Sequence, residues 1–329
     1  MENKKQLVLD AFNNKETGRV PVGFWFHHTK NQRLSAYELP EMREQNLSGN
    51  KNFFKKFNPD FVKIMSDGYF LEPKTSEFLR NVKSASDLYG LKPIDDNDKW
   101  ILDQVSLVKE LVSFFGGEVL SFYNIFAPLM SFKWSIENGD KKIAEFIKED
   151  KYAVIYALDV ISQNTQKLVK AVFSETKVDG IYLSVQSVQD ISVGPDTYHE
   201  VVAPSELSIL TLANSISRTN ILHVCGYQGK RNNLENYKNY PAKVINFASV
   251  VEGVSLENGK KIFKDKAVIG GFDNTVDGVL YKGTKDEIQA ETRRLLQNAG
   301  RKGIILGADC TVPPDIDIEH LEWVREAAK

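Results

Sequence analysis

A histidine and a cysteine two positions apart lie inside the short apolar run NILHVCG, residues 220–226. They are His223 and Cys225, in a chain of 329 residues that holds only two cysteines and five histidines. Side chains at positions i and i+2 of an extended strand point to the same face, so the imidazole and the thiol would project together. Both groups are ligands that suit zinc and related transition metals. The pair is therefore a candidate for part of a metal site.

The second cysteine, Cys310, ends another apolar run, GIILGADC at residues 303–310. Together with His223 and Cys225 it would make a set of two thiolates and one imidazole, which leaves one position of a tetrahedral zinc ion free, as in catalytic sites. Sulfur ligands favour zinc over magnesium or manganese. The residues alone leave another interpretation open, because free cysteines and strand histidines are also common as ordinary buried core residues.

Eight short apolar runs recur along the chain, and they are candidates for strands. They cover residues 20–26, 61–65, 119–126, 180–186, 220–226, 244–249, 267–274 and 303–310. Helical apolar spacing separates several of them, as at 101–115, 151–173 and 284–300. The last of these helices should begin at a capping box formed by Thr284 and Glu287.

Strands that alternate with helices predict a parallel sheet, and eight such units favour a closed (β/α)₈ barrel of the TIM type. A doubly wound sheet is the alternative, but no glycine-rich dinucleotide motif follows the first strand. The interval 66–118 has room for more than one helix, so we expect an elaborated loop region after the second strand. No linker divides the chain, and we expect one domain over residues 1–329.

Composition narrows the class of protein. The chain is 42% hydrophobic and 26% charged, with a formal net charge of −2, which predicts a large core and gives no reason to expect nucleic acid as a partner. The first apolar run, LVLDAF, is too short and interrupted for a signal peptide or a membrane span. We therefore expect a cytoplasmic protein without a membrane partner, whose two cysteines remain thiols.

Landmarks along the whole chain resemble the uroporphyrinogen decarboxylase superfamily, and most closely its zinc-dependent cobalamin and thiol methyltransferases. They are GRVPVGFWF, NPDFVKIMSDG, IFAPL, NILHVCG, AVIGGFDN, GTKDEI and IILGADCTVPPDIDIEHL. The resemblance implies a single (β/α)₈ barrel with zinc held by His223, Cys225 and Cys310. It also implies a small-molecule thiol or methylated substrate and a corrinoid methyl carrier on a partner protein, and it leaves a homodimer open.

Three polar residues at the ends of the first two strands are candidates for catalysis. Asp67 follows the second strand and matches an aspartate that binds substrate in the decarboxylases, although a turn or helix cap is the alternative. His27 and His28 end the first strand. Neighbouring strand residues face opposite ways, so one of the two should reach the barrel mouth and act as an acid or base or orient the substrate, while the other lies outside.

Three acidic residues near later strand ends are candidates for supporting the metal. Asp273 and Asp309 follow the seventh and eighth strands, where a carboxylate could accept the second ring N–H of the metal-bound histidine and so help to bind the cofactor. Glu252 follows the sixth strand, and a distantly related zinc barrel uses a glutamate as its fourth ligand. Solvated loop acids are the alternative for all three.

The resemblance also allows two other functions. The first is uroporphyrinogen decarboxylase activity in tetrapyrrole synthesis, which Asp67 favours. Its Arg-rich segment after the first strand is largely missing, however, with Arg19 kept but His27, His28 and Lys30 in the later positions. A substrate with many carboxylates needs such cations. The second alternative is a corrinoid- or tetrapyrrole-binding protein without turnover.

Overall fold

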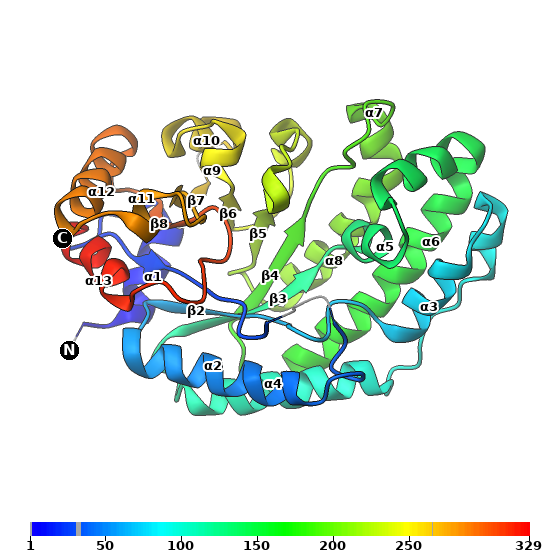
Figure 1. Cartoon of the computed structure of the whole chain (residues 1–329), viewed down its shortest axis with the longest axis horizontal. Coiled ribbons are helices and arrows are strands. Elements are labelled where there is room, and N and C mark those ends of the chain that lie inside the picture. The colour runs from blue at the N-terminus through cyan, green and yellow to red at the C-terminus, as the bar shows by residue number, and fades with distance from the viewer. Residues whose placement is uncertain (1, 31–33, 265) are drawn as a thin grey trace.

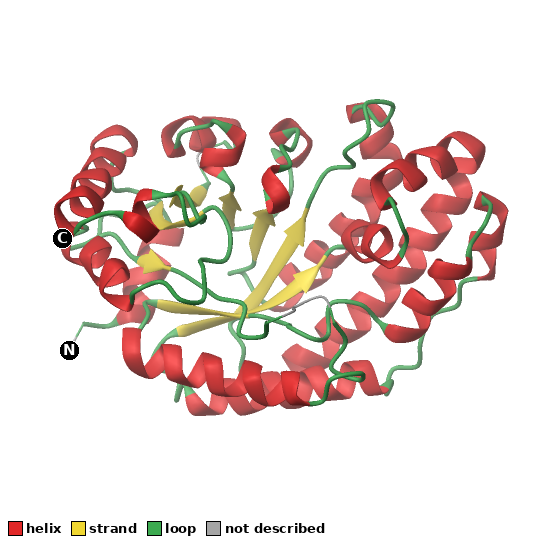
Figure 2. Ribbon diagram, viewed as in Figure 1, coloured by secondary structure: helices red, strands yellow, loops and turns green. Residues whose placement is uncertain are grey.

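The computed structural model describes residues 2–30, 34–264 and 266–329, and it brings eight parallel strands into one sheet that curves into a nearly closed barrel (Figures 1 and 2). The hydrogen-bonded order is β1-β8-β7-β6-β5-β4-β3-β2. The strands are β1 Val22–Gly23, β2 Phe61–Ile64, β3 Leu120–Phe126, β4 Gly180–Val185, β5 Ile221–Val224, β6 Val244–Phe247, β7 Ala267–Phe272 and β8 Ile304–Ala308. Every predicted run contains one strand, so the (β/α)₈ prediction is confirmed.

Helices lie between the strands and surround the sheet (Figure 2). They are α1 Lys4–Phe12, α2 Glu41–Phe57, α3 Pro73–Asn81, α4 Lys99–Phe114, α5 Pro128–Ser135, α6 Gly139–Glu175, α7 Pro195–Thr197, α8 Ala203–Ile216, α9 Ser249–Glu252, α10 Leu256–Ile262, α11 Val279–Lys282, α12 Lys285–Ala299 and α13 Ile318–Ala327. The capping box of Thr284 and Glu287 is present at the start of α12. In the described part of the chain, no helix combines the length and apolar character needed to cross a membrane.

The region between β2 and β3 is elaborated, as predicted. It holds α3, a 3₁₀ turn at Ala85–Gly90 and then α4, which packs beside α2 along one side of the barrel (Figure 1). The indole of Trp100 in α4 donates a hydrogen bond to the carbonyl of Tyr69, 2.9 Å away. This bond ties the segment directly after β2 to the outer helix.

One end of the barrel interior is filled by side chains. Phe61, Phe122 and Ile221 point inward from their strands and are buried. Phe12 of α1 packs on Phe122 with ring centroids 5.9 Å apart, so α1 covers the end at which the strands begin. The end at which the strands finish is the one that carries the site in other barrels of this type.

A buried ion pair lies where β1 and β2 approach each other. The Arg19 guanidinium binds both oxygens of Asp60 at 2.6 and 2.7 Å, and Asp60 also accepts a hydrogen bond from the backbone N–H of Val22 at 2.8 Å. Arg19 precedes β1 and Asp60 precedes β2, so the pair lies at the end where the strands begin. Arg19, which matches the decarboxylase signature, is therefore far along its strand from the barrel mouth and holds the barrel wall together.

Candidate metal centre

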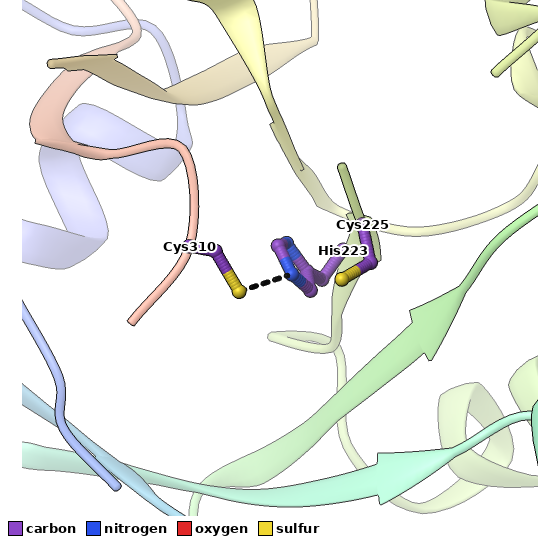
Figure 3. A group of neighbouring side chains, drawn as sticks. All are labelled: His223, Cys225 and Cys310. Atoms are coloured by element: carbon purple, nitrogen blue, oxygen red, sulfur yellow. Dashed lines mark hydrogen bonds between the residues drawn. The ribbon is translucent and has the colours of Figure 1, made fainter. Parts of the chain in front are cut away.

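The three predicted zinc ligands come together at the mouth of the barrel. His223 lies in β5, Cys225 follows that strand directly, and Cys310 lies two residues beyond β8 (Figure 3). Nε2 of His223 is 3.7 Å from Sγ of Cys310, and one ligand atom from each residue lies within 4.8 Å of the other two. Strands β5 and β8 are three places apart in the sheet, so it is the curvature of the barrel that brings their side chains together.

These distances fit a single small cation. Zinc bonds of about 2.3 Å to sulfur and about 2.0 Å to nitrogen place neighbouring tetrahedral ligands roughly 3.5–3.8 Å apart, close to the observed separation of Nε2 and Sγ. The donor set holds two sulfurs and one imidazole and no carboxylate. This chemistry suits zinc rather than a hard cation such as magnesium or calcium. The residues present therefore fit the metal that the sequence predicted.

The histidine is prepared for metal binding by its surroundings. Burial lowers the pKa of His223, with a further contribution from the Lys63 ammonium, so the imidazole is neutral, as a ligand must be. Asn246 occupies the paired position on β6 and interacts with the His223 ring. Its Oδ1 and the Nδ1 of His223 are both buried without another hydrogen-bond partner. The amide oxygen can accept a hydrogen bond from the Nδ1–H group, which leaves the lone pair of Nε2 free for the metal.

The two sulfurs differ in protonation. A hydrogen bond from Cys225, together with His223, holds the pKa of Cys310 well below its usual range. The same hydrogen bond, with burial, raises the pKa of Cys225 well above its usual range. Cys310 is therefore the more acidic of the two thiols. A cation that binds both sulfurs must displace the protons that they carry.

Glu252 holds the loop after β5 rather than joining the ligand cluster. Its carboxylate accepts hydrogen bonds from the backbone and side-chain N–H groups of Asn232 at 2.9–3.0 Å. The Asn232 amide in turn donates to the carbonyl of Cys225 at 3.0 Å. Among the described residues, the cluster that could hold a metal does not include Glu252. The suggestion of a glutamate ligand is not supported, and Glu252 acts on Cys225 through Asn232.

A small cavity opens beside the ligands. It encloses about 30 Å³, room for about two water molecules at 10–15 Å³ each. Four aromatic rings form one wall, with successive centroids 4.5–6.4 Å apart: Phe70, Phe126, Trp134 and Tyr227. These rings come from four separate segments, so the sequence pattern did not reveal the wall. Its apolar surface keeps bulk water away from the open side of the ligands.

The neighbouring histidines of the first strand separate as predicted. His27 lines the cavity, and its Nδ1 is 2.7 Å from Oδ1 of the fully buried Asp67. The second oxygen of Asp67 accepts the backbone N–H of His28 at 2.8 Å. The His28 ring instead stacks on Phe26 and faces Gly49 of α2, and burial lowers its pKa to about 4. The His28 ring is thus not among the residues that line the cavity, and a catalytic role for it stays a prediction.

The hydrogen bonds of Asp309 and Asp273 go to other groups than the His223 ring. The Asp309 carboxylate accepts hydrogen bonds from the backbone N–H groups of Val250 and Val251, and so caps the start of α9. Asp273 accepts the backbone N–H of Thr275 at 2.8 Å, in the turn after β7. Both carboxylates therefore accept hydrogen bonds from backbone N–H groups near the strand ends. A role in cofactor binding stays a prediction for these residues, and Asn246 takes the place expected for them beside His223.

Lys63 is a residue that motif reasoning missed. It lies in β2, is buried, and lines the cavity together with the three ligands. Its Nζ is 4.8 Å from the Trp25 ring centroid and 4.2 Å from that of Tyr182. Burial lowers the pKa of Lys63 to about 8, with Cys310 and Cys225 acting in the opposite direction. The signal in the sequence was a lysine within the otherwise apolar strand FVKIM.

Comparisons with known proteins agree with this fold. A methyltransferase from Methanosarcina mazei has a TM-score of 0.73 at 16% identity, covering 100% of this chain and 98% of that one. A B12-independent methionine synthase from Shewanella sp. W3-18-1, in complex with selenomethionine, has a TM-score of 0.53 at 13% identity, with 94% of both chains covered. A putative vitamin-B12-independent methionine synthase from Listeria monocytogenes has a TM-score of 0.56 at 12% identity, covering 95% and 98%.

At these identities the structural likeness shows the shared fold. A search among curated proteins gives no match. The sequence does match the family described as uroporphyrinogen decarboxylase (URO-D), and the match runs over residues 3–329. Since this range is nearly the whole chain, the protein belongs to the uroporphyrinogen decarboxylase family.

Proposed function

We propose that this protein is a zinc-dependent methyltransferase that activates a substrate thiol. The observation that carries the proposal is the convergence of His223, Cys225 and Cys310 within 4.8 Å beside a cavity. A zinc ion there would take up a thiol in its fourth position and keep it as the thiolate at neutral pH. The metal would thereby supply a nucleophilic sulfur that could form a bond to the methyl carbon, while the bond from that carbon to the donor would break and leave its electron pair with the donor.

The residues around the ligands have distinct tasks in this reaction. His223 and the two cysteines hold the metal, and Asn246 fixes the imidazole. The aromatic wall excludes water, which strengthens electrostatic interactions and lowers competition from hydration of the thiolate. His27, oriented by Asp67, reaches the cavity with a polar ring that can orient the substrate.

The size of the cavity supports a small reacting group. A volume of about 30 Å³ can take a thiol sulfur and a methyl group but not a tetrapyrrole, since even a drug-sized ligand needs roughly 300 Å³ or more. A corrinoid would therefore present its methyl group from a partner protein at the barrel mouth. A small methylated compound that enters the cavity directly is the alternative donor.

The small cavity also argues against the two alternative functions, uroporphyrinogen decarboxylase and a tetrapyrrole carrier. Uroporphyrinogen is a macrocycle with many carboxylates, whereas the cavity wall is largely aromatic and no arginine is among the described residues that line it. Arg19, which matches the family signature, is paired with Asp60 at the opposite end. A protein that carries a tetrapyrrole would also need a pocket of roughly 300 Å³ or more. Neither alternative explains why two thiols and an imidazole meet.

Metal analysis of Cys310→Ser tests the proposal. We expect the purified protein to contain close to one zinc per chain, and the variant to lose most of it while keeping its circular dichroism spectrum, because a serine hydroxyl is a poor ligand for zinc. The wild-type protein should also transfer a methyl group from methylcobalamin to a small thiol, and the variant should not.

Thr311→Ser is the matched control, since it changes the next residue and keeps both sulfurs; it should retain zinc and activity. A zinc-free wild-type protein that still transfers methyl groups would overturn the proposal. Release of carbon dioxide from uroporphyrinogen would instead support the decarboxylase, and binding of a porphyrin without turnover would support the carrier.

A further inference from the structure

A lysine side chain, that of Lys63, lies among the described residues that line the cavity beside the candidate metal ligands. Lys63 projects from β2 into the barrel, and its ammonium lies against the faces of Trp25 and Tyr182. Both of these rings also pack against His223, with centroids 6.2 and 6.0 Å from the imidazole. The ammonium is therefore separated from the first metal ligand by no more than one layer of aromatic rings.

The surroundings of Lys63 do not neutralise it by direct pairing. Cation–π contacts stabilise an ammonium but do not cancel its charge. In the structure as described, the contacts of its Nζ are the two rings, and the titratable groups that act on it electrostatically are Cys310, Cys225 and Asp67. Asp67 is already bound to His27 and to the backbone of His28. Lys63 thus faces both sulfurs across the cavity, and with a metal bound to both cysteines these would be thiolates.

The charges of the proposed site show what such a cation would do. Two thiolates cancel the charge of a divalent zinc ion, and the imidazole is neutral, so the three ligands and the metal carry no net charge. A neutral group in the fourth position leaves the centre neutral. A thiolate in that position adds one negative charge in a buried environment, where an unpaired charge is strongly disfavoured.

We propose that Lys63 is a positioning residue that makes the open position of this metal centre selective for an anionic ligand, a thiolate, over a neutral one. Its ammonium balances the single negative charge that the substrate brings after the thiol proton has left to solvent. The inference rests on the proposed metal site and deepens it, because it specifies the charge state of the substrate group. A neutral side chain at this position would leave the same ligands with weaker discrimination.

Cobalt substitution gives a test that does not depend on turnover. Co²⁺ replaces zinc, and an added thiolate increases the sulfur-to-cobalt charge-transfer absorption above that of the two cysteine ligands. The wild-type protein and Lys63→Met are titrated with 2-mercaptoethanol and, separately, with imidazole as a neutral ligand, at several pH values. Methionine fills a similar volume without a charge, so the barrel should stay folded.

We expect Lys63→Met to bind 2-mercaptoethanol about tenfold or more weakly at pH 7, with the pH midpoint of thiolate binding raised by about one unit. Affinity for imidazole should change by less than about twofold, because the neutral ligand adds no charge. Lys63→Arg keeps the charge and should restore much of the thiol affinity. Lys266→Met, which removes a half-buried lysine just before β7 at the other end of the barrel, is the matched control.

The outcomes separate the inference from the proposed function. If Lys63→Met binds Co²⁺ and 2-mercaptoethanol with the wild-type pH midpoint, the electrostatic role is wrong while the metal site stands. If thiol and imidazole weaken equally, Lys63 only supports packing and the inference is overturned. If the wild-type protein binds neither Co²⁺ nor Zn²⁺, the proposed function fails and the inference fails with it.

Discussion

His27 and His28 are adjacent in the chain but have different surroundings, and Asp67 touches both. It binds the ring of His27 and only the backbone of His28. One ring therefore faces the cavity, and the other packs behind the barrel wall against α2. The difference arises from strand geometry, which sends successive side chains to opposite faces. It allows the two histidines to serve as controls for each other.

Alanine substitution should separate these two roles. We expect His27→Ala to lower the rate of methyl transfer by about tenfold or more, because a substrate-orienting group is lost. It should also lower the free energy of unfolding by about 1–3 kcal/mol, because the buried Asp67 carboxylate loses its ring partner. His28→Ala should leave the rate nearly unchanged and lower the free energy of unfolding by about 1–3 kcal/mol, because it empties a buried, packed position. Initial rates and urea unfolding curves measure both effects. Equal rate losses in the two variants would contradict the assignment.

The sequence identified the three residues of the candidate metal site because their type and spacing are informative, whereas the residues that support them have no recognisable pattern. Histidine and cysteine at i and i+2, together with a distant cysteine, already indicated a site, and the structure brings them together. Asn246 was not identifiable, since its role depends on pairing between β5 and β6. Acidic residues at strand ends were the natural expectation, but Asp309 caps α9 instead.

At the scale of elements, apolar runs located the strands better than they defined their ends. The first run covers residues 20–26, but only Val22–Gly23 pair with β8. Trp25 and Phe26 continue the alternation without a sheet partner, one packing on Tyr182 in the barrel and the other on Phe53 outside. Side-chain periodicity thus extends beyond the hydrogen-bonded ladder. The alternation of residues therefore predicts which side chains are buried. It does not predict where hydrogen bonding ends, because this depends on the adjacent strand.

A buried glutamate links helix α8 to the segment before β6. Glu206 of α8 accepts hydrogen bonds from the hydroxyls of Tyr198 and Tyr240 at 2.8 and 2.6 Å. Its other oxygen is buried without a partner. Burial raises the pKa of Glu206 to about 7, despite the two tyrosine hydroxyls. The folded protein therefore holds a proton there that the unfolded chain releases at lower pH.

This proton makes stability depend on pH. A folded-state pKa above the unfolded value means that the contribution of Glu206 is fully present below about pH 4.5 and is lost as pH rises through about 7. The loss amounts to roughly 3 kcal/mol, at 1.36 kcal/mol per pKa unit. We expect Glu206→Gln, which has no proton to lose, to reduce this decline. Unfolding free energies at pH 5 and pH 8 measure it, and an unchanged decline in the variant would refute the assignment.

At the scale of the whole molecule, the closed barrel could be predicted from eight strands that alternate with helices, but the side-chain contacts that join β1 to β2 could not. Strand β1 has two residues, and Gly23 gives room to Phe61 of β2, whose ring lies where a Cβ would be. The Arg19–Asp60 pair spans this seam. The same arginine that matched a substrate-binding signature thus has a structural role, which only the position of the strand ends could reveal.

Breaking this pair should cost more stability than breaking any exposed one. We expect Asp60→Ala to lower the free energy of unfolding by up to about 3–5 kcal/mol, because the Arg19 guanidinium loses its buried carboxylate and keeps only that of the more exposed Glu2, 2.6 Å away. The N–H of Val22 also loses its acceptor. The double variant Arg19→Met, Asp60→Leu should recover part of this loss, since no charge remains buried.

Glu235→Ala, which breaks the exposed pair with Lys238, should change stability by less than about 1 kcal/mol. Urea unfolding of the four proteins forms the comparison, and zinc content should not change because the seam lies at the end away from the ligands. A loss for Asp60→Ala as small as that for Glu235→Ala would mean that the barrel closes without the ion pair.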